Sequence, residues 1–171
     1  MIAAGALVLR PPARDDAAEV LALLTDPEVL RWNAVPEVVD EASAAEWCAR
    51  SADWSDGDHA TFAVLESGRL VGTVSVHQID HVQGTAEIGY RVAPWARGRG
   101  VATLALGAAA SWALGEEGLV RVQLYHAAGN PASCRVAEKC GFRYEGTLRS
   151  SFVYGDGRRH DEHLHARLAT D

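Results

Sequence analysis

The spacing of apolar positions divides the chain into stretches typical of strands and stretches typical of helices. Alternation of apolar and polar residues, or short β-branched runs between turn residues, predicts strands. These strands cover residues 6–10, 62–66, 70–78, 85–92, 120–126, 144–154 and 158–168. Turns are predicted at residues 67–69, 79–84 and 155–157, where glycine or polar residues separate the strands.

Helical spacing marks four other stretches. Asp16 and Glu19 look like a capping pair for a helix whose apolar face holds Ala17, Val20, Leu21 and Leu24. A second helix is expected over residues 40–51, after an irregular segment at residues 28–36. A third begins near Val101, with an apolar stripe of Val101, Leu104, Ala105, Ala108 and Trp112. The fourth opens at Asn130 and Pro131 and stops at Gly141, a pattern favoured at helix ends.

Composition narrows the class of protein. The chain has 171 residues, of which 48% are hydrophobic and 23% charged, so we expect one globular domain over residues 1–171. A net charge of −7, without a basic run, argues against nucleic-acid binding and is compatible with a cationic substrate.

The cysteines and the N-terminal sequence indicate the compartment. Cys48, Cys134 and Cys140 form neither an even set nor a CxxC pair, which predicts reduced thiols and no zinc site or other metal site. We find no signal-peptide pattern and no apolar run long enough for a membrane span, so a cytoplasmic protein is expected.

The chemistry centres on the junction between the strand at residues 85–92 and the helix after it. Arg97, Gly98, Arg99 and Gly100 lie in this junction. The glycines permit positive φ, and unpaired N–H groups at the helix start, the helix dipole and the arginines suit a phosphate or pyrophosphate. The alternative is a glycine-rich turn that binds no ligand.

This junction resembles the acyl-CoA-binding motif of the GNAT superfamily of N-acetyltransferases, Arg/Gln-x-x-Gly-x-Gly/Ala. Arg97, Gly100 and Ala102 occupy its defined positions. The order of predicted elements is similar to the GNAT fold along nearly the whole chain. Further strings at residues 87–90, 130–133, 138–142, 145–149 and 161–162 resemble the RimJ/RimL-type branch, which acetylates ribosomal-protein N-termini. The implied fold is α/β (α+β), a mixed, mostly antiparallel sheet with a central parallel strand pair and flanking helices.

The resemblance implies acetyl-CoA as cosubstrate and a direct attack by an amine in a ternary complex. It implies that Val92 bonds the pantetheine arm and that the amides between Gly98 and Thr103 hold the pyrophosphate. The cofactor-binding residues implied are Val92, Arg97, Gly98, Arg99, Gly100, Val101, Ala102, Thr103, Asn130 and Ser133. Ser133 is the candidate proton donor to the CoA sulfur. The structural alternatives are that Asn130 is only a helix cap and that Ser133 only occupies the first helical turn, without a role in the chemistry.

The general base is less narrowly defined. Glu87 on the central strand is the first candidate, acting through water, and Asp161 and Glu162 are second choices. A salt bridge to Arg91 or a solvated strand face would equally explain Glu87. Trp32, Glu87 and Asp161 are the candidate acceptor-binding residues, and His77 and His81 are more often structural at such positions.

Two kinds of acceptor are compatible with the sequence, a protein N-terminal α-amine and a small amine. A polyamine or antibiotic N-acetyltransferase uses the same scaffold, and a non-catalytic acyl-CoA-binding module is the alternative from another class. Dimerisation is common in this branch, and the sequence leaves the oligomeric state open.

Overall fold

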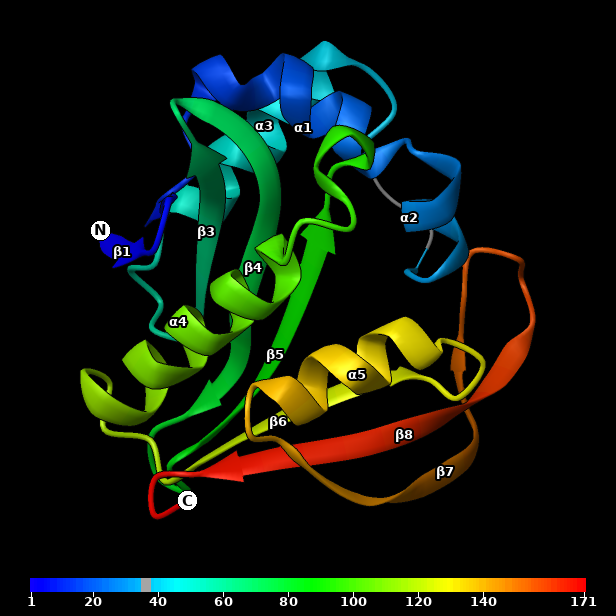
Figure 1. The fold of residues 1–171 in the computed structure, drawn as a ribbon. Coiled ribbons are helices and arrows are strands. Elements are labelled where there is room, and N and C mark those ends of the chain that lie inside the picture. Colours follow the sequence, from blue (N-terminus) through cyan, green and yellow to red (C-terminus); the bar gives the residue numbers. More distant parts are fainter. Residues whose placement is uncertain (35–37) are drawn as a thin grey trace.

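A computed structural model describes residues 1–34 and 38–171 (Figure 1). The strands are β1 (Ile2–Ala4), β2 (Leu7–Arg10), β3 (His59–Glu66), β4 (Arg69–Asp80), β5 (Thr85–Val92), β6 (Arg121–Ala127), β7 (Arg143–Val153) and β8 (Arg159–Leu168). The α-helices are α1 (Ala17–Leu24), α2 (Pro27–Arg31), α3 (Glu41–Ala52), α4 (Val101–Gly115) and α5 (Pro131–Lys139), with 3₁₀ turns at Arg14–Asp16 and Pro94–Ala96.

The strands form one eight-stranded sheet in the order β1-β2-β3-β4-β5-β6-β8-β7. All neighbours are antiparallel except β5 and β6, which are parallel and joined by α4. A parallel pair needs such a crossover, because a short turn only reverses the chain. The predicted mixed sheet with a central parallel pair is therefore confirmed.

Helices cover both faces of the sheet (Figure 1). Phe62 and Val64 of β3 belong to the core under α4, whereas their neighbours Ala63 and Leu65 pack in the core with α1 and α3. This split follows from the two-residue period of a strand. The helices α4 and α5 lie on the same face of the sheet, and they contact each other.

Several local expectations were wrong, each for an identifiable reason. The N-terminal residues form an additional strand, β1, which turns at Gly5 (φ +61°) and pairs with β2. Part of the segment expected to be irregular is α2, because the Asp26 carboxylate caps it by accepting from the amides of Glu28 and Val29. The strand β4 runs to Asp80, two residues into the expected turn.

The expected capping pair before α1 serves tertiary contacts instead. The Asp16 carboxylate accepts two hydrogen bonds from Arg10, each at 2.8 Å, and Glu19 accepts from the Leu70 amide at 3.0 Å. A capping carboxylate does form at α3, where Asp40 Oδ1 accepts from the Ser43 amide at 2.8 Å. Asp16 also accepts from the Ala13 amide at 2.8 Å, so it closes the 3₁₀ turn before α1, and only Glu19 is taken by a partner distant in sequence.

The predicted stripe of α4 is only partly correct. Val101 and Ala105 are buried as expected, but Leu104 is 44% exposed. The buried face continues through Leu106, Ala109, Ala110 and Ala113. A run this rich in alanine is apolar on all sides, so spacing alone does not fix which side contacts the sheet.

Candidate functional site

The centre of the molecule holds a gap between the two parallel strands. Hydrogen-bond pairing between β5 and β6 covers only residues 85–87 and 121–123, ending at Glu87 opposite Gln123. From there β5 continues to Val92 along β4 alone, and the strands diverge (Figure 1). The carboxyl half of β5 therefore presents main-chain groups toward the gap rather than toward β6.

The predicted anion cradle lies beside this gap, at the start of α4. Gly98 and Gly100 have φ of +73° and +79°, and Gly100 is the residue that precedes the helix. A Cβ placed on either glycine would have no described atom within 4 Å, so the space above the turn is open. The first-turn amides of a helix have no intrahelical acceptor and point along this direction. The geometry suits a pyrophosphate.

The two arginines of the cradle already have carboxylate partners. The Arg97 guanidinium donates to Asp26, and that of Arg99 donates to Glu66. Burial alone would raise the pKa of Asp26, but the hydrogen bonds from Arg97 and from the α2 amides hold it below its usual value. Both arginines are partly exposed. An arriving phosphate would therefore compete with an existing ion pair at each guanidinium.

Asn130 and Ser133 lie at the start of α5, and Ser133 contacts β5. Asn130 Oδ1 accepts from the Ser133 amide at 3.2 Å, so this side chain is a helix cap. Ser133 is 9% exposed as a residue, and its hydroxyl lies 3.0 Å from the Tyr90 hydroxyl. Burial raises the pKa of Tyr90, although its bond to Ser133 acts the other way.

Tyr90 is a site residue that the sequence reasoning missed. It belongs to the family-like string at residues 87–90, yet we gave it no role. Strand alternation was the available signal, since it places Tyr90 on the opposite face from Glu87 and Arg91. The Tyr90–Ser133 pair joins the unpaired half of β5 to α5, so two hydroxyls meet where β5 has left β6.

The opposite face of the sheet holds a cavity of about 700 Å³. Glu87 and Glu162 both line it. Side chains from β3, β4 and β5 form its floor, including His59, Thr61, Ser75, His77 and Arg91. Trp32, Trp47, Tyr125, Leu148, Phe152 and Tyr154 form aromatic and apolar walls. Two carboxylates within apolar walls suit a cationic or amine ligand.

Glu87 is electrostatically perturbed in this cavity. Its partial burial, and then the nearby charge of Glu162, raise its pKa above the usual 4.5. Glu162 is itself held in place, since it accepts hydrogen bonds from Ser151 at 2.8 Å and from Tyr154 at 2.9 Å. A carboxylate with a raised pKa is better matched to a proton-accepting role near neutral pH.

The neighbouring ionisable groups contribute differently. His77 lies opposite Glu87 on β4, and burial followed by the charge of Arg91 lowers its pKa, which favours the neutral ring. Asp161 is exposed, does not line the cavity and accepts from the Ser150 amide at 2.8 Å. Of the two second-choice bases, Glu162 is therefore the one in the cavity.

The wall at the α2 end carries the predicted tryptophan. Trp32 lines the cavity and donates from Nε1 to Glu28 at 2.7 Å. The next residue, Asn33, accepts from Arg91 Nε at 3.0 Å, which ties this segment to β5. The predicted segment 28–36 also includes residues 35 and 36, which lie outside the described residues.

Several known proteins that are similar to this chain are acetyltransferases. Residues 6–143 match the model of the acetyltransferase (GNAT) domain. YdaF of Bacillus subtilis (strain 168), named as a ribosomal N-acetyltransferase, is 39% identical over 98 residues, which is 57% of this chain. The aligned part spans only about half of that relative's length, 53%.

Two further matches cover related proteins. The spermidine N(1)-acetyltransferase of Vibrio cholerae is 30% identical over 107 residues, 62% of this chain and 61% of that protein. The structure of Mycobacterium smegmatis RimJ in complex with CoA-disulfide superposes with a TM-score of 0.86 at 27% identity, covering 99% of this chain and 85% of that one. No helix in the described part of the chain is long and apolar enough to cross a membrane.

Proposed function

Since the chain belongs to the GNAT acetyltransferase family, we propose that it transfers the acetyl group of acetyl-CoA to a primary amine, preferably a protein N-terminal α-amine. One observation carries the proposal. The gap between β5 and β6 has an anion cradle and a hydroxyl pair near it on the α4 and α5 side, and a carboxylate-lined cavity on the other face. A thioester and an amine can therefore approach the same gap from opposite faces.

The cofactor would be held in two places. Its pyrophosphate would accept hydrogen bonds from the amides between Gly98 and Thr103, at the start of α4. The pantetheine arm would lie along the unpaired side of β5, where the main chain of Val92 is available. These contacts would leave the acetyl group near Tyr90 and Ser133.

The amine must lose a proton before or during its attack. Glu87, with its raised pKa, is the proposed acceptor of that proton through an intervening water, and Glu162 would hold the incoming cation. Deprotonating an α-amine of pKa ~7.8 at pH 7 costs about 1.1 kcal/mol, against about 4.6 kcal/mol for a lysine of pKa ~10.4. An N-terminal amine therefore demands less of this base.

The leaving sulfur needs a proton at the other end of the reaction. Ser133 is the proposed donor, and Tyr90 is placed to replace the proton that Ser133 gives up. The tetrahedral intermediate would also gain from a main-chain N–H of β5 near its oxyanion. Both hydroxyls lie on the face that carries the cradle.

A polyamine is the second candidate acceptor. The favouring observation is the pair of carboxylates, Glu87 and Glu162, because a cation with several amines gains from both. The spermidine acetyltransferase among the relatives fits the same idea. An N-terminal peptide instead needs room for a chain, which the 700 Å³ cavity gives to its first residues.

Thiol release from acetyl-CoA tests the proposal. The panel contains peptides that begin with Ala or Ser, their N-terminally blocked versions, spermidine and an aminoglycoside. We expect turnover with the free peptides and none with the blocked ones. CoA binding by calorimetry without thiol release across the panel would instead indicate a non-catalytic acyl-CoA-binding module. Absence of any CoA binding would overturn the proposal.

A further inference from the structure

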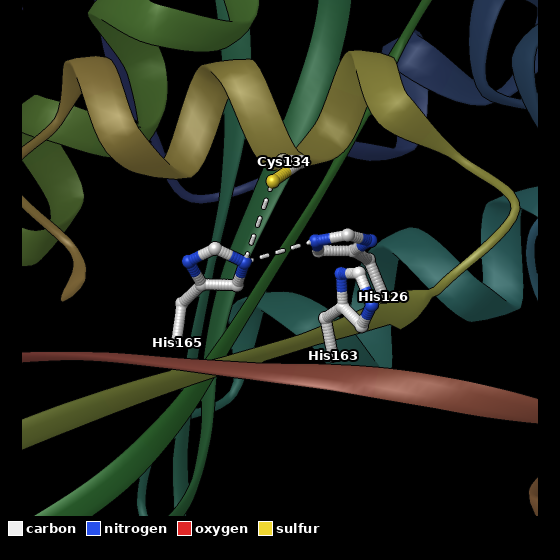
Figure 2. A group of neighbouring side chains, drawn as sticks. All are labelled: His126, Cys134, His163 and His165. Atoms are coloured by element: carbon white, nitrogen blue, oxygen red, sulfur yellow. Dashed lines mark hydrogen bonds between the residues drawn. The ribbon is translucent and has the colours of Figure 1, made fainter. Parts of the chain in front are cut away.

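A cluster of metal-ligating side chains lies under α5, apart from the cavity on the other face of the sheet. It consists of His126 on β6, Cys134 on α5, and His163 and His165 on β8 (Figure 2). One potential ligand atom from each residue lies within 4.8 Å of the corresponding atoms of the other three. None of these residues lines the cavity that holds Glu87.

The sheet register brings the three histidines together. His126 pairs directly with His163 across β6 and β8, and His165 lies two residues further along β8 on the same face. Cys134 follows Ser133 in the first turn of α5 and points down toward this face (Figure 2). The four side chains come from three elements, so their approach is a tertiary feature.

The distances match a tetrahedral zinc site. His126 Nε2 and His165 Nε2 are 3.2 Å apart, and Cys134 Sγ lies 3.8 Å from His165 Nε2. Zinc bonds of about 2.0–2.1 Å to nitrogen and 2.3 Å to sulfur place tetrahedral ligand atoms roughly 3.3–3.6 Å apart. The His126, His165 and Cys134 atoms are thus near their ligand positions, and small side-chain rotations would complete the set with His163.

The hydrogen bonds around the cluster suit metal binding. His126 Nδ1 lies 2.8 Å from the Ala127 carbonyl, which fixes the proton on Nδ1 and leaves a lone pair on Nε2. A metal-ligating histidine is oriented by this kind of second bond. His165 faces His126 and Cys134 through Nε2, and His163 Nδ1 is buried without a hydrogen-bond partner among the described residues. Buried polar atoms without partners are uncommon, and a bound ion is one explanation for them.

The charge next to the cluster and its access from solvent also suit a bound zinc ion. Cys134 Sγ lies 3.7 Å from a carboxylate oxygen of Glu138, one turn further along α5. A Zn²⁺ ion with one thiolate would carry a charge of +1, which the Glu138 carboxylate would neutralise. His126 and His165 are buried, whereas Cys134 and His163 are half-buried, so the site can be reached from solvent.

We propose that His126, Cys134, His163 and His165 bind one Zn²⁺ ion that links α5 to β6 and β8. Four protein ligands leave no open coordination position, which is typical of a structural site rather than a catalytic one. On binding, the Cys134 thiol releases one proton to solvent and its sulfur forms the bond to zinc. Since α5 also carries Asn130 and Ser133, the ion would fix the helix that holds the candidate proton donor. The absence of a CxxC pair does not argue against this site, because its ligands are far apart in sequence.

Zinc binding to the whole chain, stripped with a chelator and studied without acetyl-CoA, tests this proposal separately from the proposed function. We expect one Zn²⁺ per chain and a rise in melting temperature of about 5–10 °C at a hundredfold excess of zinc over its Kd. Replacing Zn²⁺ by Co²⁺ should give visible absorption bands typical of tetrahedral coordination and a thiolate-to-metal charge-transfer band in the near ultraviolet.

Variants then locate the ion. Cys134→Ser changes one atom, so it should keep the fold while losing the charge-transfer band and at least tenfold in zinc affinity. His126→Asn should also lose at least tenfold. Two controls should bind as the parent does: Cys140→Ser, at another half-buried thiol, and His59→Gln, at the separate group of Asp56, Asp58 and His59. Absence of stoichiometric zinc, binding unchanged in Cys134→Ser and His126→Asn, or loss of binding in His59→Gln would overturn the proposal.

Discussion

Replacing Ser133 by alanine tests the proposed path of the proton to the CoA sulfur. Ser133 is a buried residue of a helix whose cap is Asn130, and its hydroxyl lies 3.0 Å from the Tyr90 hydroxyl. Ser133→Ala removes this hydroxyl but retains the amide that Asn130 accepts from. The helix should therefore stay in place while the sulfur loses its proton donor.

The size of the effect follows from the leaving group. The pKa of a thiol, about 8.5, lies about 1.5 units above pH 7. Departure of the sulfur as a thiolate therefore costs about 2 kcal/mol more than departure as a protonated thiol, which corresponds to roughly 30-fold in rate. We expect kcat to fall between about tenfold and 30-fold at pH 7. The loss should shrink as the pH rises toward 9, because a free thiolate is then the stable product. CoA affinity should stay near that of the parent.

The measurement is steady-state thiol release between pH 6.5 and 9, with CoA affinity from calorimetry. Ser111→Ala, an exposed serine on α4, is the matched control and should change neither quantity. Tyr90→Phe and the double variant with both substitutions complete a double-mutant cycle. If Tyr90 acts through Ser133, the double variant should be little slower than Ser133→Ala alone.

Two results would refute this reasoning. An unchanged kcat in Ser133→Ala would remove the hydroxyl from the mechanism. A loss that is the same at every pH would show that the hydroxyl acts in binding or positioning rather than as a proton donor. A fall in melting temperature of more than about 4 °C would correspond to more than about 1 kcal/mol and would indicate a disturbed fold instead.

Three further predictions concern the base, the cavity wall and stability. Glu87→Gln should lower kcat at least tenfold and remove the acid limb of the pH profile of kcat. That limb lies above pH 4.5 in the parent, because the pKa of Glu87 is raised. A variant whose pH profile matches that of the parent would exclude Glu87 as the base. Gly155→Ala should lower the melting temperature and raise the acceptor KM, because the added Cβ would clash with the Leu30 carbonyl oxygen. Gly146→Ala is the control, since its added Cβ meets no described atom within 4 Å. Asp16→Ala should cost about 2 kcal/mol, or roughly 4–8 °C at pH 7, by leaving the Arg10 guanidinium without its carboxylate. Since hydrogen bonds to Arg10 lower the pKa of Asp16 despite its burial, this stabilisation is present above the unfolded pKa of about 3.9 and is lost as pH falls through the folded value. Melting curves of parent and variant should therefore converge in acid, and a constant difference would contradict the linkage.

The strands and the cradle could be predicted from the sequence because their signals are local. A two-residue period identified β3, β4 and β5, and glycines before an apolar helix identified the turn at Gly98 and Gly100. The order of elements then restricted the topology, since a strand, a helix and a strand in succession favour a parallel pair. Local signals failed where a distant partner competed, as at Glu19 with the Leu70 amide.

The partners across the gap could not be read from spacing. Tyr90 and Ser133 are 43 residues apart, and Glu87 and Glu162 face one cavity from strands at different positions in the sheet. Strand alternation gives the face of each side chain, but not which other strand or helix lies over it. The choice between Asp161 and Glu162 illustrates this, because adjacent residues on β8 point to opposite sides.

The sequence by itself determined most of the segments that become strands and helices, though not β1 or α2, and it placed a glycine turn where a helix begins. These features depend on backbone preferences and on period, which act over a few residues. Only the tertiary structure decided which side chains meet: the hydroxyl pair at the gap, the two carboxylates in the cavity, and the three histidines with Cys134 beneath α5. Such groups converge because strand register and helix docking bury a shared apolar core, and that burial is a property of the whole chain.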